Sequence, residues 1–366
     1  MYIDRKPIAS HSLVYMVPRE YRLYLLLALL LLLGISAFIA INTGSIAIST
    51  KDIISALLGP LAIFFGFAEI SSETTQIILQ LRIPRALLAM LSGSALALSG
   101  AALQGLFRNS LADPALIGVS SGGAVGAGLA MLLGAQFSNN WIQIGGPLGI
   151  LFAAMFGSIC STYLVYILSK TGGRIHVPTM LLCGIAINAL GGAVIGVMLY
   201  IADFDTLRDI TFWSMGSFAR APSFAVFSVT PIIIILSICI LRHSTALNIL
   251  LLGNAETIHL GHDPHPLQKR IIILCSSVVG LSVALCGSIA FVGLIIPHLA
   301  RLLVGPNHRF LLPVSALGGA ILMLMVDTLA RSLLDYAELP IGILTAFIGA
   351  PFFLYLLLTA RRKEIV

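Results

Sequence analysis

Charged side chains inside apolar stretches are the residues of this sequence most able to do chemistry. Asp327 is the clearest acidic residue within such a stretch, and Arg331 follows it at the spacing that puts both on one helix face. Charges inside a membrane are costly, so they are usually paired or functional. We expect a structural ion pair between Asp327 and Arg331, because a single carboxylate makes a poor proton relay.

The sequence contains little that an enzyme would need. It has no Gly-Lys pair and therefore no Gly-rich phosphate loop, so we predict that the chain has no ATP site of its own. His298, between Pro297 and Arg301, has no Cys, Asp or second His at metal-ligand spacing. No nucleophile–base pair stands out, and the five cysteines fall inside apolar segments. We therefore predict that the chain is not an enzyme and needs no metal or cofactor.

Three arginines stand where the predicted topology places the outside of the membrane. Arg82 and Arg85 stand where the second apolar stretch opens and share a helix face, and Arg331 lies near the outer end of the ninth. Basic residues on that side run against the usual bias of Lys and Arg toward the cytoplasm. They are either helix-end anchors or a docking patch for an acidic partner or anionic substrate.

The elements that must position these residues are membrane helices. The chain has 366 residues, of which 58% are hydrophobic and only 10% charged, and its mean hydropathy is +1.02. A soluble domain carries about 25% charged residues, so a water-facing surface cannot be built here. Long continuous apolar runs favour helices over a barrel. We predict an all-α integral membrane protein whose net charge of +6 reflects basic helix ends rather than nucleic-acid binding.

The apolar runs predict about ten transmembrane helices, since each crossing needs roughly 20 residues. We place them near 23–41, 84–106, 115–134, 147–169, 178–201, 224–241, 269–290, 294–304, 311–333 and 342–360. The eighth is too short to cross by itself. With alternating spans, 15 of the 21 Lys and Arg residues share the side of the N-terminus, which predicts that both termini are cytoplasmic.

Glycine and alanine patterns predict how the helices are related and packed. Gly93, Ala97, Leu98 and Gly100 recur 187 residues later as Gly280, Ala284, Leu285 and Gly287. The second and seventh spans run in opposite directions, so the two halves are candidates for inverted repeats. Small residues at four-residue spacing predict close helix packing. These sets are Gly93/Ala97/Ala101, Gly122/Gly126 and Gly192/Gly196.

A polar segment at 247–261 reads as a short cytoplasmic helix with glycine caps at Gly253 and Gly261. A partner without membrane segments of its own could grip such a helix. The alternative is an ordinary interfacial helix, and spacing does not separate the two.

Taken together, the motifs resemble the FecCD-type permeases of ABC importers for iron chelates, heme and cobalamin over nearly the whole chain. The matching stretches are Arg82-Ile-Pro-Arg85, Gly100 with Gln104, Arg108-Asn-Ser-Leu-Ala-Asp-Pro114, Gly118-Val-Ser-Ser-Gly122, Gly287 through Phe291-Val-Gly-Leu294, Pro297-His298-x-x-Arg301, Leu312-Pro313, Asp327-x-x-x-Arg331, Glu338-Leu-Pro-Ile-Gly342 and Gly349-Ala-Pro-Phe352. The resemblance implies a single permease domain over 1–366 with the BtuC-like type II ABC importer fold. It also implies a dimer around a central pathway.

The resemblance implies roles for particular residues. Acidic residues of a periplasmic-type binding protein would dock on Arg82, Arg85 and Arg331. A cytoplasmic gate would include Asn109, Leu111 and Pro178. The ATPase would contact 247–261 through Leu252, Gly253, Glu256, Leu260 and Gly261. Ser110, Asn254 and Thr257 depart from the residues usual at their positions in the family.

The implied function is that of a multi-pass permease subunit in the inner (cytoplasmic) membrane of a bacterium. Its partners would be separate ABC ATPase subunits, a periplasmic-type binding protein and a second permease copy or paralogue. The stretches 184–190 and 207–217 look most like the heme-importing branch, which favours heme over ferric siderophores, with cobalamin third. No histidine stands on the outer half to ligate heme iron, although a carrier need not hold its cargo tightly. The alternatives in other classes are an ion-coupled secondary transporter and, less well supported, a stand-alone enzyme.

The missing phosphate loop makes a direct prediction about energy use. We expect the purified chain to hydrolyse no ATP by itself and the assembled complex to do so through a separate nucleotide-binding subunit. Phosphate release by the chain in detergent, with and without that subunit, measures this. ATP hydrolysis intrinsic to the chain would contradict the prediction.

Overall fold

The computed structural model describes residues 17–44, 46, 48–58, 71–136, 146–171, 174–261, 263–334 and 337–364. In these ranges the regular structure is helical except for one short antiparallel pair. It joins β1 (Lys170–Thr171) to β2 (Arg174–Ile175) between two long helices. The predicted all-α class is therefore confirmed.

Ten apolar helices correspond one to one with the ten predicted spans. They are α1 (Arg22–Asn42), α5 (Ile83–Phe107), α6 (Val119–Gln136), α7 (Gly146–Leu168), α8 (Val177–Ile201), α10 (Ser223–Arg242), α13 (Pro264–Cys286), α14 (Val292–Val304), α15 (His308–Ser332) and α16 (Ile341–Glu364). Seven contain a stretch long and apolar enough to cross a membrane, whereas α6, α14 and α16 have shorter ones. The 13 residues of α14 span only about 20 Å at 1.5 Å per residue, which agrees with its predicted shortness.

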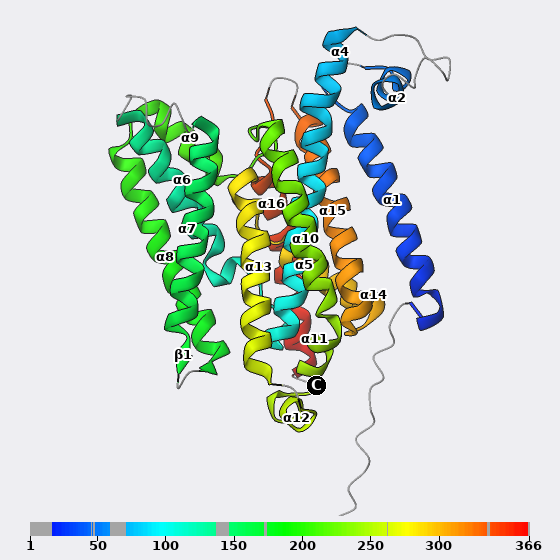
Figure 1. Cartoon of the computed structure of the whole chain (residues 1–366), viewed down its shortest axis with the longest axis vertical. Coiled ribbons are helices and arrows are strands. Elements are labelled where there is room, and N and C mark those ends of the chain that lie inside the picture. Colours follow the sequence, from blue (N-terminus) through cyan, green and yellow to red (C-terminus); the bar gives the residue numbers. More distant parts are fainter. Residues whose placement is uncertain are drawn as a thin grey trace, which may run out of the picture.

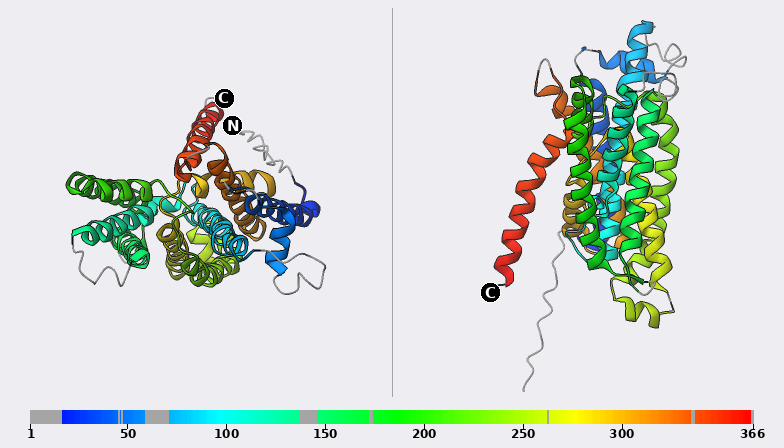
Figure 2. Two further views of the ribbon diagram at one scale, coloured as in Figure 1. Left: turned by 90° about the horizontal axis from the view of Figure 1, so that it is seen from above. Right: turned by 90° about the vertical axis from the view of Figure 1, so that its left-hand side faces the viewer.

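Short helices gather at the two ends of the bundle (Figure 1). At one end lie α2 (Thr50–Leu58), α4 (Ser72–Gln76) and α9 (Phe204–Ser214), and at the other α11 (Ser244–Leu250), α12 (Asn254–His259) and the β pair. We call these the outer and inner ends, following the predicted orientation. Helix α1 begins and α16 ends at the inner end, as an even number of crossings requires (Figures 1 and 2). The first 16 residues lie outside the described ranges.

The centre of the bundle is α5, which α10, α13, α14 and α15 surround (Figure 2, left). Leu88, Leu98 and Leu103 on this helix are fully buried. A Cβ on Gly100 would come within 1.8 Å of the Gly293 carbonyl oxygen, so only glycine permits the observed approach of α14. Because lipid gives helices little hydrophobic reason to associate, such close backbone contact is a main source of packing energy.

Only some of the glycines at four-residue spacing lie in close helix contacts. Gly93 faces the backbone of α15, while Gly122 and Gly126 face the backbone of α7. In contrast, a Cβ added at Gly192 or Gly196 on α8 would meet no atom of the described chain within 4 Å. These last two therefore do not pack as the spacing predicted, because they lie on an outward face of the bundle.

The two helices that carry the repeated glycine and alanine pattern run in opposite directions, as predicted. Helix α5 runs from the outer to the inner end, and α13 lies beside it and runs back (Figure 1). The last span, α16, leans away from the helices around α5 (Figure 2, right). Its Phe347 and Leu354 are exposed at 75% and 59%, so one face of α16 has no cover within the described chain.

Candidate functional site

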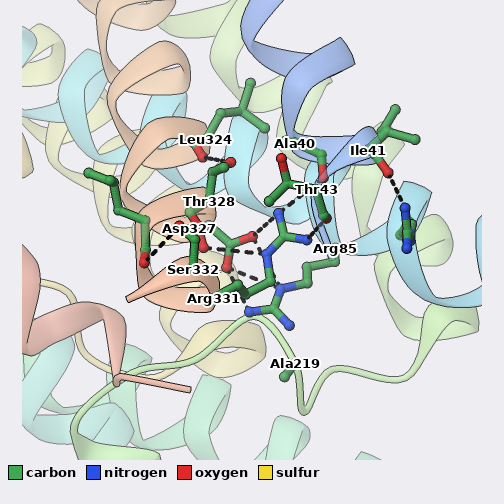
Figure 3. A network of polar contacts seen from close by, with 12 residues as sticks. Ala40, Ile41, Thr43, Arg85, Ala219, Leu324, Asp327, Thr328, Arg331 and Ser332 are labelled. Carbon is green, nitrogen blue, oxygen red and sulfur yellow. Dashed lines mark hydrogen bonds and ion pairs between the residues drawn. The ribbon is translucent and has the colours of Figure 1, made fainter. Parts of the chain in front are cut away.

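Five charged residues form a network at the outer end, which we call the outer-end network. Its members are Arg82, Arg85, Asp327, Arg331 and Glu338. They come from η2 (Ile77–Arg82), a π-helical segment that continues into α5, from α5 and α15, and from the stretch before α16. Figure 3 shows Arg85 and Arg331 converging on Asp327. The fold thus brings residues 82–85 together with residues 327–338, which are more than 200 positions away in the sequence.

The Asp327 carboxylate is fully buried at the centre of this network. Arg331 Nη2 lies 3.2 Å from its Oδ2, the pair that the i,i+4 spacing indicated. Arg85 makes more contacts with the same group: its Nε donates to both oxygens at 3.1 Å and its Nη2 donates to Oδ1 at 2.9 Å. A buried carboxylate needs such charge-assisted partners, because water cannot supply them. No local spacing reveals Arg85, which is 242 residues away in the sequence.

Arg82 does not point the same way as Arg85, although three residues separate them. Its Nη1 donates to the carbonyls of Ile41 at 2.8 Å and Asn42 at 3.0 Å, and its Nη2 donates to that of Ile46. The last carbonyls of a helix lack partners within the helix and form the negative end of its dipole. Arg82 therefore caps the C-terminus of α1, which has no basic residue in its own last turn.

Arg331 caps the same helix end through other carbonyls. Its Nη1 donates to the Thr43 carbonyl at 2.7 Å and its Nη2 to the Ala40 carbonyl at 3.0 Å (Figure 3). Two arginines from distant segments thus attach α1 to the bundle. Sequence reasoning missed this role, because the end of an apolar helix does not reveal which distant cations will reach its carbonyls.

The three arginines predicted to dock a partner are largely enclosed by these contacts. The side chains of Arg85 and Arg331 are exposed at only 14% and 9%, whereas Glu338 is exposed at 47%. A cavity of about 270 Å³ opens beside them and is lined by Gln80, Glu338 and all three arginines. The docking role stays a prediction.

The inner end of α5 closes in a tight turn that holds two of the predicted gate residues. Arg108 adopts a left-handed conformation at φ 51°, which ends the helix. The Leu111 amide then donates to Asn109 Oδ1 at 2.9 Å, and the Ala115 amide donates to Asp113 Oδ1 at 2.8 Å. Burial raises the pKa of the Asp113 carboxyl, and the bond from the Ala115 amide offsets part of this rise. Leu111 remains 37% exposed.

The third predicted gate residue, Pro178, lies in the first turn of α8. Helix α8 meets the segment that follows the turn, η3 (Pro114–Ile117), six residues further along, where a Cβ on Gly184 would lie 1.6 Å from the Leu116 carbonyl oxygen. Asn188 reinforces this contact by accepting from Ser121 Oγ at 2.6 Å and donating to the Ala115 carbonyl at 3.0 Å. The fold holds α8 against the turn, and the gate role of the three residues stays a prediction.

The segment 247–261 forms parts of two short helices rather than one. Helix α11 ends at Leu250 and α12 begins at Asn254, with Gly253 at φ 121° between them and Gly261 at φ 80° after α12. Both glycines thus occupy helix boundaries, as expected. Thr257 is buried and donates to the Gly253 carbonyl at 2.5 Å.

Helix α12 and its flanks present an apolar tip at the inner end (Figure 1). Leu252, Ile258 and Leu260 are exposed at 61%, 56% and 57%, and Glu256 is exposed beside them. An apolar patch with a charged neighbour is typical of a surface that another protein covers. Of these residues, Ile258 was not among the predicted ATPase contacts.

His298 and its neighbours belong to the packing of α14 against α16 and α5. The His298 ring meets Phe352 edge-on with centroids 6.3 Å apart. Arg301 Nη2 donates to Gln104 Oε1 at 3.3 Å. Within the described ranges, no group of three or more His, Cys, Asp or Glu side chains could hold a metal ion. The geometry of this region indicates helix packing rather than catalysis.

Comparison with known proteins identifies a family. The model of the FecCD transport family matches residues 29–359. The chain is 39% identical to the hemin transport system permease protein HmuU of Yersinia pestis, with 92% of this chain and 96% of that protein covered. It is 41% identical, with the same coverage, to the molybdate import system permease protein MolB of Haemophilus influenzae. It is 40% identical to the cobalamin import system permease protein BtuC of Halobacterium salinarum, over 80% and 76% of the two chains.

A solved structure agrees with this assignment. A metal-chelate type ABC transporter in an inward-facing conformation superimposes with a TM-score of 0.78 at 38% identity, over 92% of this chain and 99% of that one. The fold that the resemblance implied is therefore confirmed.

The buried carboxylate of the outer-end network allows a stability prediction. We expect Asp327→Ala to lower the free energy of unfolding by about 3–5 kcal/mol, because it leaves Arg85 and Arg331 facing each other without their shared counter-charge. Asp209→Ala is the matched control: its pair with Arg220 is 3.2 Å long but exposed, so its loss should cost only about 0–1 kcal/mol. Thermal unfolding of the purified variants in detergent measures both. Equal, small losses would contradict the assignment.

Proposed function

The chain belongs to the FecCD transport family of ABC importer permeases, and we propose that it carries an iron compound, with heme favoured over ferric siderophores and cobalamin third. The family match over residues 29–359 carries the transport function. The cargo rests on the stretches 184–190 and 207–217, which look most like the heme-importing branch.

The relatives differ in what they are named for, so their identities do not choose the cargo. Permeases for hemin, cobalamin and molybdate are 39%, 40% and 41% identical to this chain. The two stretches that favour heme both make hydrogen bonds that join neighbouring elements. Asn188 bridges α6 and η3, and the carbonyls of Met215 and Gly216 accept the first amides of α16 at 2.9 and 3.1 Å.

Energy enters through a separate ATPase subunit, because the chain has no phosphate loop. We assign the docking of that subunit to the apolar tip formed by Leu252, Ile258 and Leu260 at the inner end. Gly253 and Gly261 set the orientation of α12 through their positive φ angles, and Glu256 adds a charge at its start. The nearby turn with Asn109 and Leu111, together with Pro178, is proposed as the inner gate.

Two further partners fit the remaining exposed surfaces. An acidic periplasmic-type binding protein suits the outer cavity with its three arginines. A second permease copy or paralogue suits the uncovered faces of α8 and α16, where Leu182, Tyr200 and Phe347 are exposed at 67%, 90% and 75%. Both termini are proposed to lie in the cytoplasm, on the side of α12.

Cargo is tested by uptake into proteoliposomes that contain this chain, its ATPase and its binding protein. We expect ATP-driven accumulation of hemin, and none with a non-hydrolysable ATP analogue. Ferric siderophore, cobalamin and molybdate serve as competing cargoes in parallel reactions. Uptake of cobalamin or molybdate but not hemin would overturn the cargo, and uptake driven by an ion gradient without ATP would overturn the importer class.

The apolar tip makes a prediction about coupling. Leu252→Glu and Leu260→Glu should weaken ATPase docking by roughly 2 kcal/mol or more and abolish uptake, because each places a charge in a surface that must lose water. Leu333→Glu, at a leucine of similar exposure (54%) at the outer end, should leave ATPase binding unchanged. Co-purification of the ATPase and uptake are measured together. Normal uptake in both tip variants would show that this segment is only an interfacial helix.

A further inference from the structure

Arg85 binds two carboxylates, one buried and the other exposed. Its Nε and Nη2 donate to Asp327, which is fully buried. Its Nη1 donates to Glu338 Oε1 at 2.9 Å, and the Glu338 side chain is 47% exposed. One guanidinium group therefore has an inward face with an enclosed partner and an outward nitrogen with a partner in solution.

The two ion pairs differ in how firmly they are held. Asp327 binds Arg85 through three contacts between 2.9 and 3.1 Å and sits on α15, a long helix packed against α5. Glu338 binds through one nitrogen and belongs to the short stretch between α15 and α16. Removing one partner of a buried ion pair strongly destabilises the folded protein, because the other charge stays buried without a partner. An exposed ion pair contributes only about 0–1 kcal/mol to folding stability. Asp327 by itself keeps Arg85 in place, and Glu338 is exchangeable.

Within the described part of the chain, the other two arginines of the network have no outward nitrogen that pairs with an exposed carboxylate. Arg82 donates to two carbonyls at the end of α1 and to that of Ile46 beyond it. Arg331 donates to the Ala40 and Thr43 carbonyls and pairs with Asp327. The cavity of about 270 Å³ that reaches the network is lined by Gln80, Arg85 and Glu338 among others. A carboxylate entering from outside thus meets Arg85 Nη1 at the place that Glu338 already occupies.

We propose that Glu338 is an internal competitor for the partner's carboxylate at Arg85. With nothing docked, Glu338 holds Nη1; an acidic residue of the docked binding protein takes that position, and Glu338 moves into solution. The inference rests on the proposed docking of an acidic protein at the outer end. It makes Glu338 a residue that sets docking affinity and selects for partners able to displace it.

The exchange has a measurable consequence. When the partner's carboxylate replaces that of Glu338, the number of ion pairs does not change. This contact therefore adds little to the free energy with which the wild-type chain binds its partner. The network carries three arginines against Asp327 and Glu338, and removal of the Glu338 charge raises its net charge from +1 to +2. An acidic partner is then attracted more strongly and has no competitor. Glu338→Gln should therefore bind the partner about two- to five-fold more tightly.

The test measures the affinity of the full-length chain in lipid nanodiscs for its binding protein at low salt. The binding protein is identified as the one whose deletion abolishes the same uptake. Glu338→Gln is compared with Glu73→Gln, which removes an exposed carboxylate on α4 at the same end of the bundle. We expect tighter binding for the first variant and a wild-type Kd for the second. In an Arg85→Gln background, Glu338→Gln should tighten binding less than it does in the wild-type background, because the change in net charge remains but the contested donor is gone.

The outcomes separate the inference from the proposed docking. If Arg85→Gln weakens binding but Glu338→Gln leaves the Kd unchanged or higher, docking stands and the competitor role is wrong. Equal tightening by Glu73→Gln also overturns the role, since any lost negative charge would then suffice. If Arg85→Gln binds like wild type, docking at this site fails. Should Arg85→Gln not insert, the salt dependence of wild-type binding tests docking instead, because a charge-driven contact must weaken as salt rises.

Discussion

Asp327 carries a negative charge that water does not reach, and the outer end of the bundle is arranged around it. Its carboxylate binds Arg85 from α5 and Arg331 from its own helix. Arg331 in turn binds the last carbonyls of α1, as Arg82 does from η2. One buried charge thus links three helices. The cost of leaving it unpaired in an apolar medium is what keeps the arrangement together.

The same central helix connects this network to the inner end. Helix α5 begins beside Arg85 and ends at the left-handed Arg108, where the turn with Asn109 and Leu111 starts. Along its length, glycines bring α14 and α15 into backbone contact, so the helix has little room to move by itself. The proposed docking surface at the outer end and the proposed inner gate are therefore joined by one closely packed element. This geometry suits a protein in which events on one side of a membrane must reach the other.

The two proposed docking surfaces use different physics because their surroundings differ. The outer surface is charged and recessed, so charge complementarity would govern association rate and partner choice. The inner surface is a projecting apolar tip, whose leucines and isoleucine must be covered by a partner to lose contact with water. The inner tip is held in shape by Thr257 and the glycines beside it rather than by ion pairs.

The amino-acid sequence by itself determined the membrane class, the ten helical segments, the lack of a phosphate-loop motif and the Asp327–Arg331 pair. Each depends on composition or on spacing within one helix, where the period of the α-helix dictates which residues are neighbours. Only the tertiary structure decided that Arg85 binds Asp327, that Arg82 turns toward α1, that 247–261 divides into two helices and that Gly192 faces outward. These outcomes depend on how each helix is rotated and which distant segment it meets. Rotation and partner choice are settled by packing over the whole bundle, so no local pattern in the sequence encodes them.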